Sequence, residues 1–147
     1  FPAVESSASS MEESLSLETG EFQGVGTILL VDDESMVREV AEAMLIHGGY
    51  DVVPAESGSR AVELFAELGE DIDCVLLDLA MPDMDGLETF RALRALREDV
   101  RVLLSSGYSE QDALTRFGGK KLAGFLQKPY HASTLLDAVQ QILRKKG

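Results

Sequence analysis

The sequence has one cysteine, few basic residues and no long apolar run, and each of these scarcities excludes a class of structure or function. Cys74 is the single cysteine, so no disulfide can form within the chain, and a reducing, cytoplasmic compartment is the simplest interpretation. No apolar run is long enough to span a bilayer. Basic residues number 13 against 26 acidic ones, and the net charge of −13 opposes binding to nucleic acid phosphates. We therefore expect a cytoplasmic protein with no membrane segment and no direct nucleic acid contact.

The length of 147 residues suits one domain with a core and an additional tail. Residues 1–24 contain six serines and five glutamates but no lysine or arginine. Such a segment buries too little apolar surface to offset the entropy lost on ordering. We predict an acidic tail or linker over residues 1–24 and a folded domain over residues 25–147.

The folded part alternates short apolar runs with amphipathic stretches. The runs are continuous and rich in Val, Leu and Ile, which is typical of parallel strands buried on both faces. They span residues 28–31, 50–53, 74–77, 102–104 and 122–126, and helical patterns span residues 35–47, 57–68, 87–97, 109–117 and 132–144. Ser57 and Ser109 are candidate N-caps, and Gly48-Gly49 is a candidate stop. The alternation predicts a doubly wound α/β sandwich.

Acidic residues follow two of the predicted strands. Asp32 and Asp33 come directly after the first strand, and Asp78 ends the third. Ligands bind at the carboxyl ends of parallel strands, and carboxylates that converge there raise at least one pKa unless a cation lies among them. Oxygen ligands with room for water suit Mg²⁺. A solvated turn at Asp32-Asp33 is the alternative.

Polar residues also follow the last two predicted strands. Ser105-Ser106-Gly107 provides hydroxyl groups and Lys128-Pro129 provides an ammonium group. A hydroxyl donor and a fixed cation beside a metal-bound carboxylate meet the needs of phosphoryl transfer. Each residue type is also common in ordinary loops. Their shared position at one edge of the sheet favours a single site.

Together these motifs resemble the receiver domain of two-component response regulators. Asp32-Asp33, Asp78 in DLAMPDMDG, Ser106-Gly107 and Lys128-Pro129 occur in the order and spacing of that family, over roughly residues 26–147. The resemblance implies a flavodoxin-like (βα)5 fold with strand order 2-1-3-4-5.

The resemblance implies a role for each acidic residue. Asp78 would accept a phosphoryl group from a histidine kinase or a histidine phosphotransfer domain. Asp33, Asp78 and the backbone carbonyl of Ala80 would bind Mg²⁺ directly, and Asp32 would assist largely through water. The residue types themselves indicate that Asp83, Asp85 and Gly86, in the following loop, only shape a turn.

The remaining matched residues would contact the phosphate or respond to it. By resemblance, Ser106 and Lys128 would each contact a phosphate oxygen, and the peptide bond before Pro129 would be cis. Phe125 matches an aromatic side chain that moves inward when the hydroxyl residue moves toward the phosphate, although an ordinary core phenylalanine is the alternative. The face that switches, and that would form a homodimer, is a helix, strand and helix over residues 109–144.

Two other classes share parts of this chemistry. An aspartyl-nucleophile phosphatase of the haloacid dehalogenase type also uses Mg²⁺ and a phosphoaspartate, but it needs an acid two residues after the nucleophile, where this chain has Ala80. A calcium loop at MPDMDG would place Met81 and Ala92 at ligand positions, which neither side chain can fill. The receiver is therefore favoured, with no enzymatic activity beyond its own phosphorylation and dephosphorylation.

The wider context is predicted from short segments. SSGYSE and GFLQKPY resemble receivers fused to hybrid sensor histidine kinases, and FPAVES looks like the closing strand of a kinase ATPase domain. The last predicted helix is followed by only a few residues, so we expect no DNA-binding domain after it. We favour the receiver module of a hybrid histidine kinase, with a stand-alone single-domain response regulator as the alternative.

Overall fold

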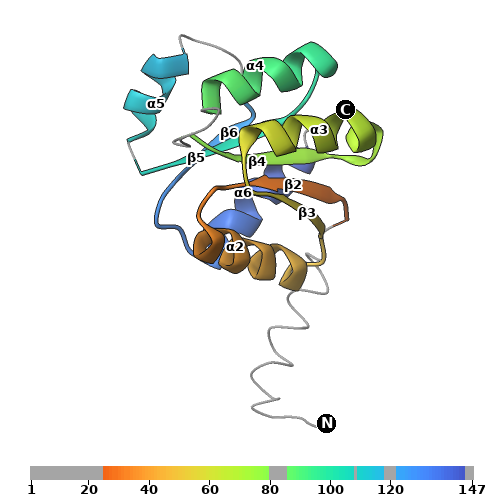
Figure 1. Cartoon of the computed structure of the whole chain (residues 1–147). Coiled ribbons are helices and arrows are strands. Elements are labelled where there is room, and N and C mark those ends of the chain that lie inside the picture. Colours follow the sequence, from red (N-terminus) through yellow and green to blue (C-terminus); the bar gives the residue numbers. More distant parts are fainter. Residues whose placement is uncertain (1–24, 80–85, 108, 118–121, 145–147) are drawn as a thin grey trace, which may run out of the picture.

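The computed structural model describes residues 25–79, 86–107, 109–117 and 122–144. Its strands form one parallel sheet in the order β3-β2-β4-β5-β6, which is 2-1-3-4-5 when counted along the chain (Figure 1). This confirms the predicted flavodoxin-like topology. The strands are β2 (Thr27–Val31), β3 (Asp51–Ala55), β4 (Cys74–Asp78), β5 (Val102–Ser106) and β6 (Gly124–Gln127).

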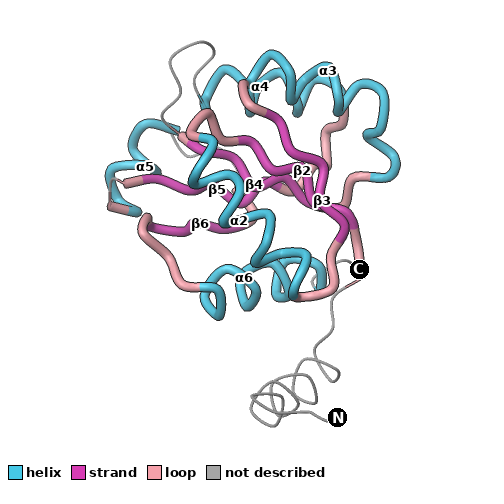
Figure 2. The backbone as a smooth tube through the Cα atoms, turned by 60° about the horizontal axis from the view of Figure 1, so that its bottom comes forward, coloured by secondary structure: helices cyan, strands magenta, loops and turns pink. Residues whose placement is uncertain are grey.

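Helices cover both faces of the sheet, as Figure 2 shows. α2 and α6 pack on one face, and α3, α4 and α5 pack on the other. In the described part of the chain, none of these helices is both long and apolar enough to cross a membrane. The helices are α2 (Ser35–His47), α3 (Gly58–Leu68), α4 (Gly86–Leu96), α5 (Glu110–Phe117) and α6 (Ala132–Arg144), with a 3-10 turn η1 (Gly69–Asp71).

The starts of α3 and α5 and the end of α2 lie at the predicted capping residues. The Ser57 hydroxyl accepts the Arg60 N–H at 3.1 Å, and the Ser109 hydroxyl accepts the Asp112 N–H at 3.2 Å. Both are N-caps, as predicted. α2 stops before Gly48-Gly49, where Gly49 has a φ of 98° that glycine adopts with little strain.

The two faces of the sheet bury alternate residues of each strand. Cys74 belongs to the cluster under α2 and α6, where burial raises the pKa of its thiol to about 12, so it is a neutral core residue. Burial on both faces explains the continuous apolar runs. One cluster contains Leu29, Val31, Val75, Leu77 and Leu104, and the other contains Ile28, Leu30, Leu76, Leu103 and Leu126.

β6 begins later than predicted. The apolar pattern predicts a strand from residue 122, but the ladder with β5 starts where Leu103 pairs with Gly124. Ala123 lies just before the strand, with its N–H donated to the carbonyl of Val102 at 2.9 Å. Among the described strands, β6 pairs only with β5. The first residue of β6 is therefore set by where its ladder with β5 begins. Apolar character alone does not reveal that point.

Gly86 packs directly on the backbone of the strand that carries Asp78. Its N–H donates to the Leu79 carbonyl oxygen at 2.9 Å. A Cβ at residue 86 would lie 2.8 Å from the Leu79 Cα and 3.0 Å from the Asp78 carbonyl oxygen. The sequence predicts Gly86 only as a turn residue, whereas the structure shows that a close backbone approach excludes any side chain there.

We expect Gly86→Ala to lower the free energy of unfolding by about 1–3 kcal/mol, because the overpacked Cβ faces backbone that cannot move aside. Gly69→Ala is a matched control, since its Cβ would lie 3.7 Å from the nearest atom, in the Phe65 ring. Urea unfolding of both variants measures the difference. Equal stability of the two variants would contradict the steric argument.

Candidate functional site

Three carboxylates meet where two neighbouring strands end. β2 and β4 pair in register up to Val31 and Leu77, so the residues that follow them, Asp32 and Asp78, lie next to each other. Together with Asp33 they each offer an oxygen atom, and these atoms lie within 4.8 Å of one another. The predicted convergence is therefore present in the structure.

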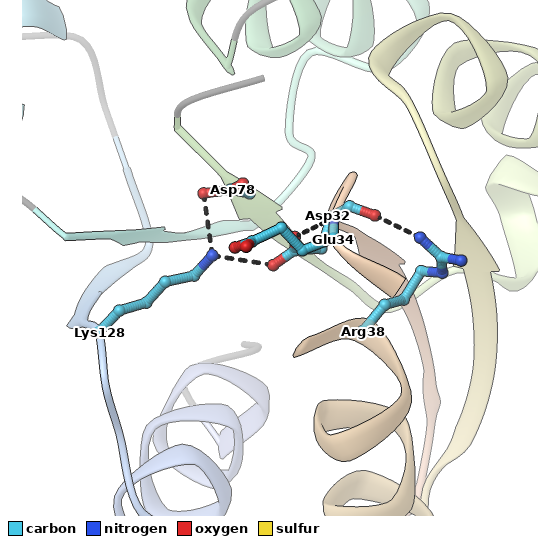
Figure 3. A network of polar contacts seen from close by, with 5 residues as sticks. All are labelled: Asp32, Glu34, Arg38, Asp78 and Lys128. Carbon is cyan, nitrogen blue, oxygen red and sulfur yellow. Dashed lines mark hydrogen bonds and ion pairs between the residues drawn. The ribbon is translucent and has the colours of Figure 1, made fainter. Parts of the chain in front are cut away.

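Among the described residues, Lys128 is the cationic side chain that forms ion pairs with these carboxylates. Its Nζ lies 2.9 Å from Asp32 Oδ2 and 3.2 Å from Asp78 Oδ1 (Figure 3). The residue directly follows β6, and its backbone N–H donates to the Ser106 carbonyl oxygen at 2.7 Å. The Lys128-Pro129 peptide bond is cis, as the resemblance implies.

Asp32 is held through each of its polar groups. Its N–H donates to the Ala55 carbonyl at 3.2 Å, and its carbonyl accepts from Arg38 Nη1 at 2.8 Å. Its Oδ1 accepts the Glu34 N–H at 2.9 Å, and its Oδ2 contacts Lys128 (Figure 3). The side chain is 3% exposed, whereas Asp33 is exposed, so the two adjacent aspartates occupy different environments.

Sequence reasoning misses Arg38 and the Glu34 backbone. Both lie in or just before α2, where an arginine after DDES has no feature that distinguishes it from a solvated surface residue. The direction of the Arg38 side chain, back toward Asp32, depends on how α2 is placed against the sheet (Figure 3).

The cluster has more negative charge than Lys128 can balance. Burial raises the pKa of Asp78 from 3.8 to about 6, the Lys128 ammonium opposes this shift, and the charges of Asp32 and Asp33 add to it. Burial lowers the pKa of Lys128, but its contacts with Asp32 and Asp78 outweigh burial, so the pKa is raised and the ammonium stays charged. A second cation would relieve the remaining repulsion.

The donor set fits Mg²⁺. All three side chains are carboxylates, and the exposure of Asp33 leaves space for water on a bound ion. Asp32, Asp33 and Asp78 are thus the side chains that can hold the ion. Ala80, whose carbonyl the resemblance adds to the ligands, lies outside the described residues, as do the predicted turn residues Asp83 and Asp85.

Ser106 and Phe125 lie on the two strands beside Asp78. Ser106 ends β5 and is buried, with 1% of its surface exposed. Phe125 lies in β6 opposite Leu104, is partly buried, and packs against the apolar cluster under α3, α4 and α5. Their predicted part in a switch is not tested by these positions.

An apolar groove opens beside Lys128, between α2 and the segment after β6. Its volume is about 510 Å³, and Lys128 lies in its wall as well as in the carboxylate cluster. Met36 and Val40 are unusually exposed for apolar side chains, at 77% and 54%. The apolar wall consists of Met36, Val37, Val40, Ala41, Met44, Pro129 and Tyr130.

Comparison with known proteins gives consistent matches. The family model "Response regulator receiver domain" matches residues 28–140. The sensor kinase CckA of Brucella abortus is 36% identical over 126 residues, 86% of this chain but 13% of that protein. The chemotaxis protein CheY of Bacillus subtilis is 30% identical over 117 residues, 79% of this chain and 96% of that protein.

Solved structures agree with the sequence matches. The crystal structure of the receiver domain of the hybrid histidine kinase CckA has a TM-score of 0.68 and 34% identity, covering 80% of this chain and 99% of that one. A receiver domain protein from Clostridium thermocellum has a TM-score of 0.77 and 26% identity, covering 82% and 96%. With its strand order, its carboxylate cluster and these matches, the chain belongs to the response regulator receiver domain family of two-component signalling.

Proposed function

We propose that Asp78 accepts a phosphoryl group from a phosphohistidine. The observation that supports this most is the burial of Asp78 at the end of β4, beside Asp32 and Lys128. Lys128 forms its ion pair with Asp78 at one carboxylate oxygen, Oδ1. Both carboxylate oxygens of Asp32, in contrast, already accept hydrogen bonds. Asp78 is therefore the nucleophile, and Asp32 and Asp33 support it.

The transfer exchanges one bond for another. An Asp78 oxygen forms a bond to phosphorus, the bond between phosphorus and the donor imidazole nitrogen breaks, and its electron pair stays on that nitrogen. Lys128 offsets the charge of the phosphoryl oxygens, and the Ser106 hydroxyl donates to one of them. Asp32, Asp33 and Asp78 would hold Mg²⁺, which when bound would supply further positive charge at this site.

We also propose that the groove beside Lys128 receives the donor. The donor histidine must bring its phosphorus within bonding distance of Asp78, so its protein must lie against the surface next to that residue. The α2 wall of the groove offers apolar side chains at helical spacing: Met36 and Val40 are exposed, and Met44 is partly buried. Burial raises the pKa of Tyr130, so its neutral phenol can pack against an apolar partner. An amphipathic helix carrying the histidine fits this surface.

Several wider features stay predictions. The match to a sensor kinase favours the module of a hybrid histidine kinase, and the match along nearly all of CheY keeps the stand-alone regulator as the alternative. We predict that the protein acts in the cytoplasm without touching nucleic acid. We predict that phosphorylation changes the face formed by α5, β6 and α6, which includes Phe125 and would form any homodimer.

Incubation with acetyl phosphate and Mg²⁺ is expected to add one phosphoryl group to the wild type, detected by intact-protein mass spectrometry. Asp78→Asn should gain none, because it removes the nucleophile. Asp51→Asn is a matched control, since Asp51 is an exposed carboxylate at the opposite end of the sheet. Equal labelling of Asp78→Asn would overturn the assignment. Continuous phosphate release from small substrates would instead favour a phosphatase.

The raised pKa of Asp78 predicts a pH-dependent stability. Its pKa is about 6 in the folded state against 3.8 ordinarily, so ionisation costs more in the folded protein. This cost grows as the pH rises from about 4 to 6 and is complete above that window. Without Mg²⁺, Asp78→Asn should therefore raise the free energy of unfolding at pH 7.5 by about 1–3 kcal/mol, and change it little at pH 4.

Urea unfolding at both pH values, with and without Mg²⁺, measures this effect. Mg²⁺ should stabilise the wild type more than Asp78→Asn, because the variant lacks one of the ligands. A variant that is no more stable than the wild type at pH 7.5 without Mg²⁺ would show that Lys128 fully balances the cluster.

The groove predicts a donor-specific defect. Val40→Ser should slow phosphoryl transfer from a phosphorylated histidine phosphotransfer domain by about tenfold, since hot-spot truncation costs more than 1 kcal/mol. Labelling by acetyl phosphate should not change, because that small donor needs no docking surface. Ile46→Ser is the matched control: Ile46 is 55% exposed on α2, as Val40 is 54% exposed, but it lies outside the groove. Equal defects in both variants would contradict docking at the groove.

A further inference from the structure

Arg38 lies near the start of α2, and its side chain reaches back to the loop that follows β2. Its Nη1 donates to the Asp32 carbonyl oxygen at 2.8 Å (Figure 3). β3 ends at Ala55, whose carbonyl accepts the Asp32 N–H. The ladder between β2 and β3 stops at that bond, so the Asp32 carbonyl takes its donor from a side chain instead.

This contact acts on the residue after Asp32. The carbonyl carbon and oxygen of Asp32 and the nitrogen and Cα of Asp33 lie in one plane, because a peptide bond is planar. A hydrogen bond that holds the carbonyl therefore also fixes the direction in which Asp33 leaves the strand. Asp33 has no such restraint from burial, since it is exposed.

The other contacts of Asp32 cannot replace Arg38. Lys128 and the Glu34 N–H both bind the Asp32 carboxylate, which turns about its own side-chain bonds without moving the peptide. The bond to Ala55 lies on the nitrogen side of Asp32. Among the described residues, Arg38 is thus the contact that fixes the peptide between Asp32 and Asp33.

We propose that Arg38 is a positioning residue for the divalent cation site. By holding the Asp32-Asp33 peptide, it keeps the Asp33 carboxylate close to those of Asp32 and Asp78, as the cluster requires. The inference rests on the proposed function, because the cation belongs to the phosphoryl-transfer site. Residues that orient metal ligands without touching the metal typically contribute about 10–100-fold to its affinity.

Charge and positioning predict opposite results when Arg38 is replaced. A guanidinium repels a nearby cation, so the loss of its charge alone would tighten Mg²⁺ binding. The loss of its hydrogen bond would instead weaken binding. The direction of the change therefore separates the two effects.

Isothermal titration calorimetry with Mg²⁺ alone tests the proposal on the unphosphorylated protein. Arg38→Met should bind Mg²⁺ about 10-fold more weakly than the wild type. Arg38→Lys, which keeps the charge but not the guanidinium geometry, should lie between the two. Arg60→Met should leave the affinity unchanged, because Arg60 is an exposed arginine on α3 paired with Glu63. Circular dichroism checks that each variant is folded.

The outcomes separate this inference from the proposed function. Wild-type affinity or tighter binding in both Arg38 variants, with normal labelling of Asp78, would overturn the positioning role alone. The same loss of affinity in Arg60→Met would also overturn it, since a distant charge would then explain the effect. A wild type that neither binds Mg²⁺ nor accepts a phosphoryl group would overturn both proposals. If Arg38→Met does not fold, Arg38→Lys decides.

Discussion

The concentration of negative charge at the carboxyl ends of β2 and β4 shapes the rest of the site. Parallel pairing of these strands places Asp32, Asp33 and Asp78 together, and Lys128 offsets only part of their charge. The imbalance is visible in Asp78, whose pKa rises to about 6 through burial and through its acidic neighbours. A folded protein tolerates such an arrangement only where a cation or a change of protonation relieves it. The repulsion among these carboxylates therefore favours the binding of Mg²⁺.

The three aspartates lie in different surroundings, which suit them to different roles in the site. Asp32 has a partner at its N–H, its carbonyl and both carboxylate oxygens, so it is a fixed part of the framework. Asp33 is exposed and accessible to water and ions. Asp78 is buried at the end of β4, and Gly86 packs on the backbone behind it. Rigid support around the Asp78 carboxylate is the kind of preorganisation that favours phosphoryl transfer.

The sequence predicts the parts of this structure that depend on topology. Buried strands leave continuous apolar runs, and the residues after them share one edge of the sheet whatever the details of packing. The order of the strands is therefore enough to bring Asp32, Asp78 and Lys128 together. Arg38 and the close approach at Gly86 are not predictable in this way, because they depend on side-chain direction and on distances of a few ångströms between elements. Spacing along one chain carries neither kind of information.

Lys128 links Asp78, the groove and the predicted switching face. Its ammonium contacts Asp78, its side chain lines the groove, and its N–H bonds to Ser106 at the end of β5. A phosphoryl group on Asp78 would give this ammonium a new, more highly charged partner. Reversing a 99:1 equilibrium takes about 5.5 kcal/mol of differential stabilisation, more than one exposed ion pair supplies. The burial of Asp32 and Asp78 matters for this reason, since charges shielded from water interact more strongly. A change in the partner of Lys128 would then act on β6, the strand directly before it, which contains Phe125.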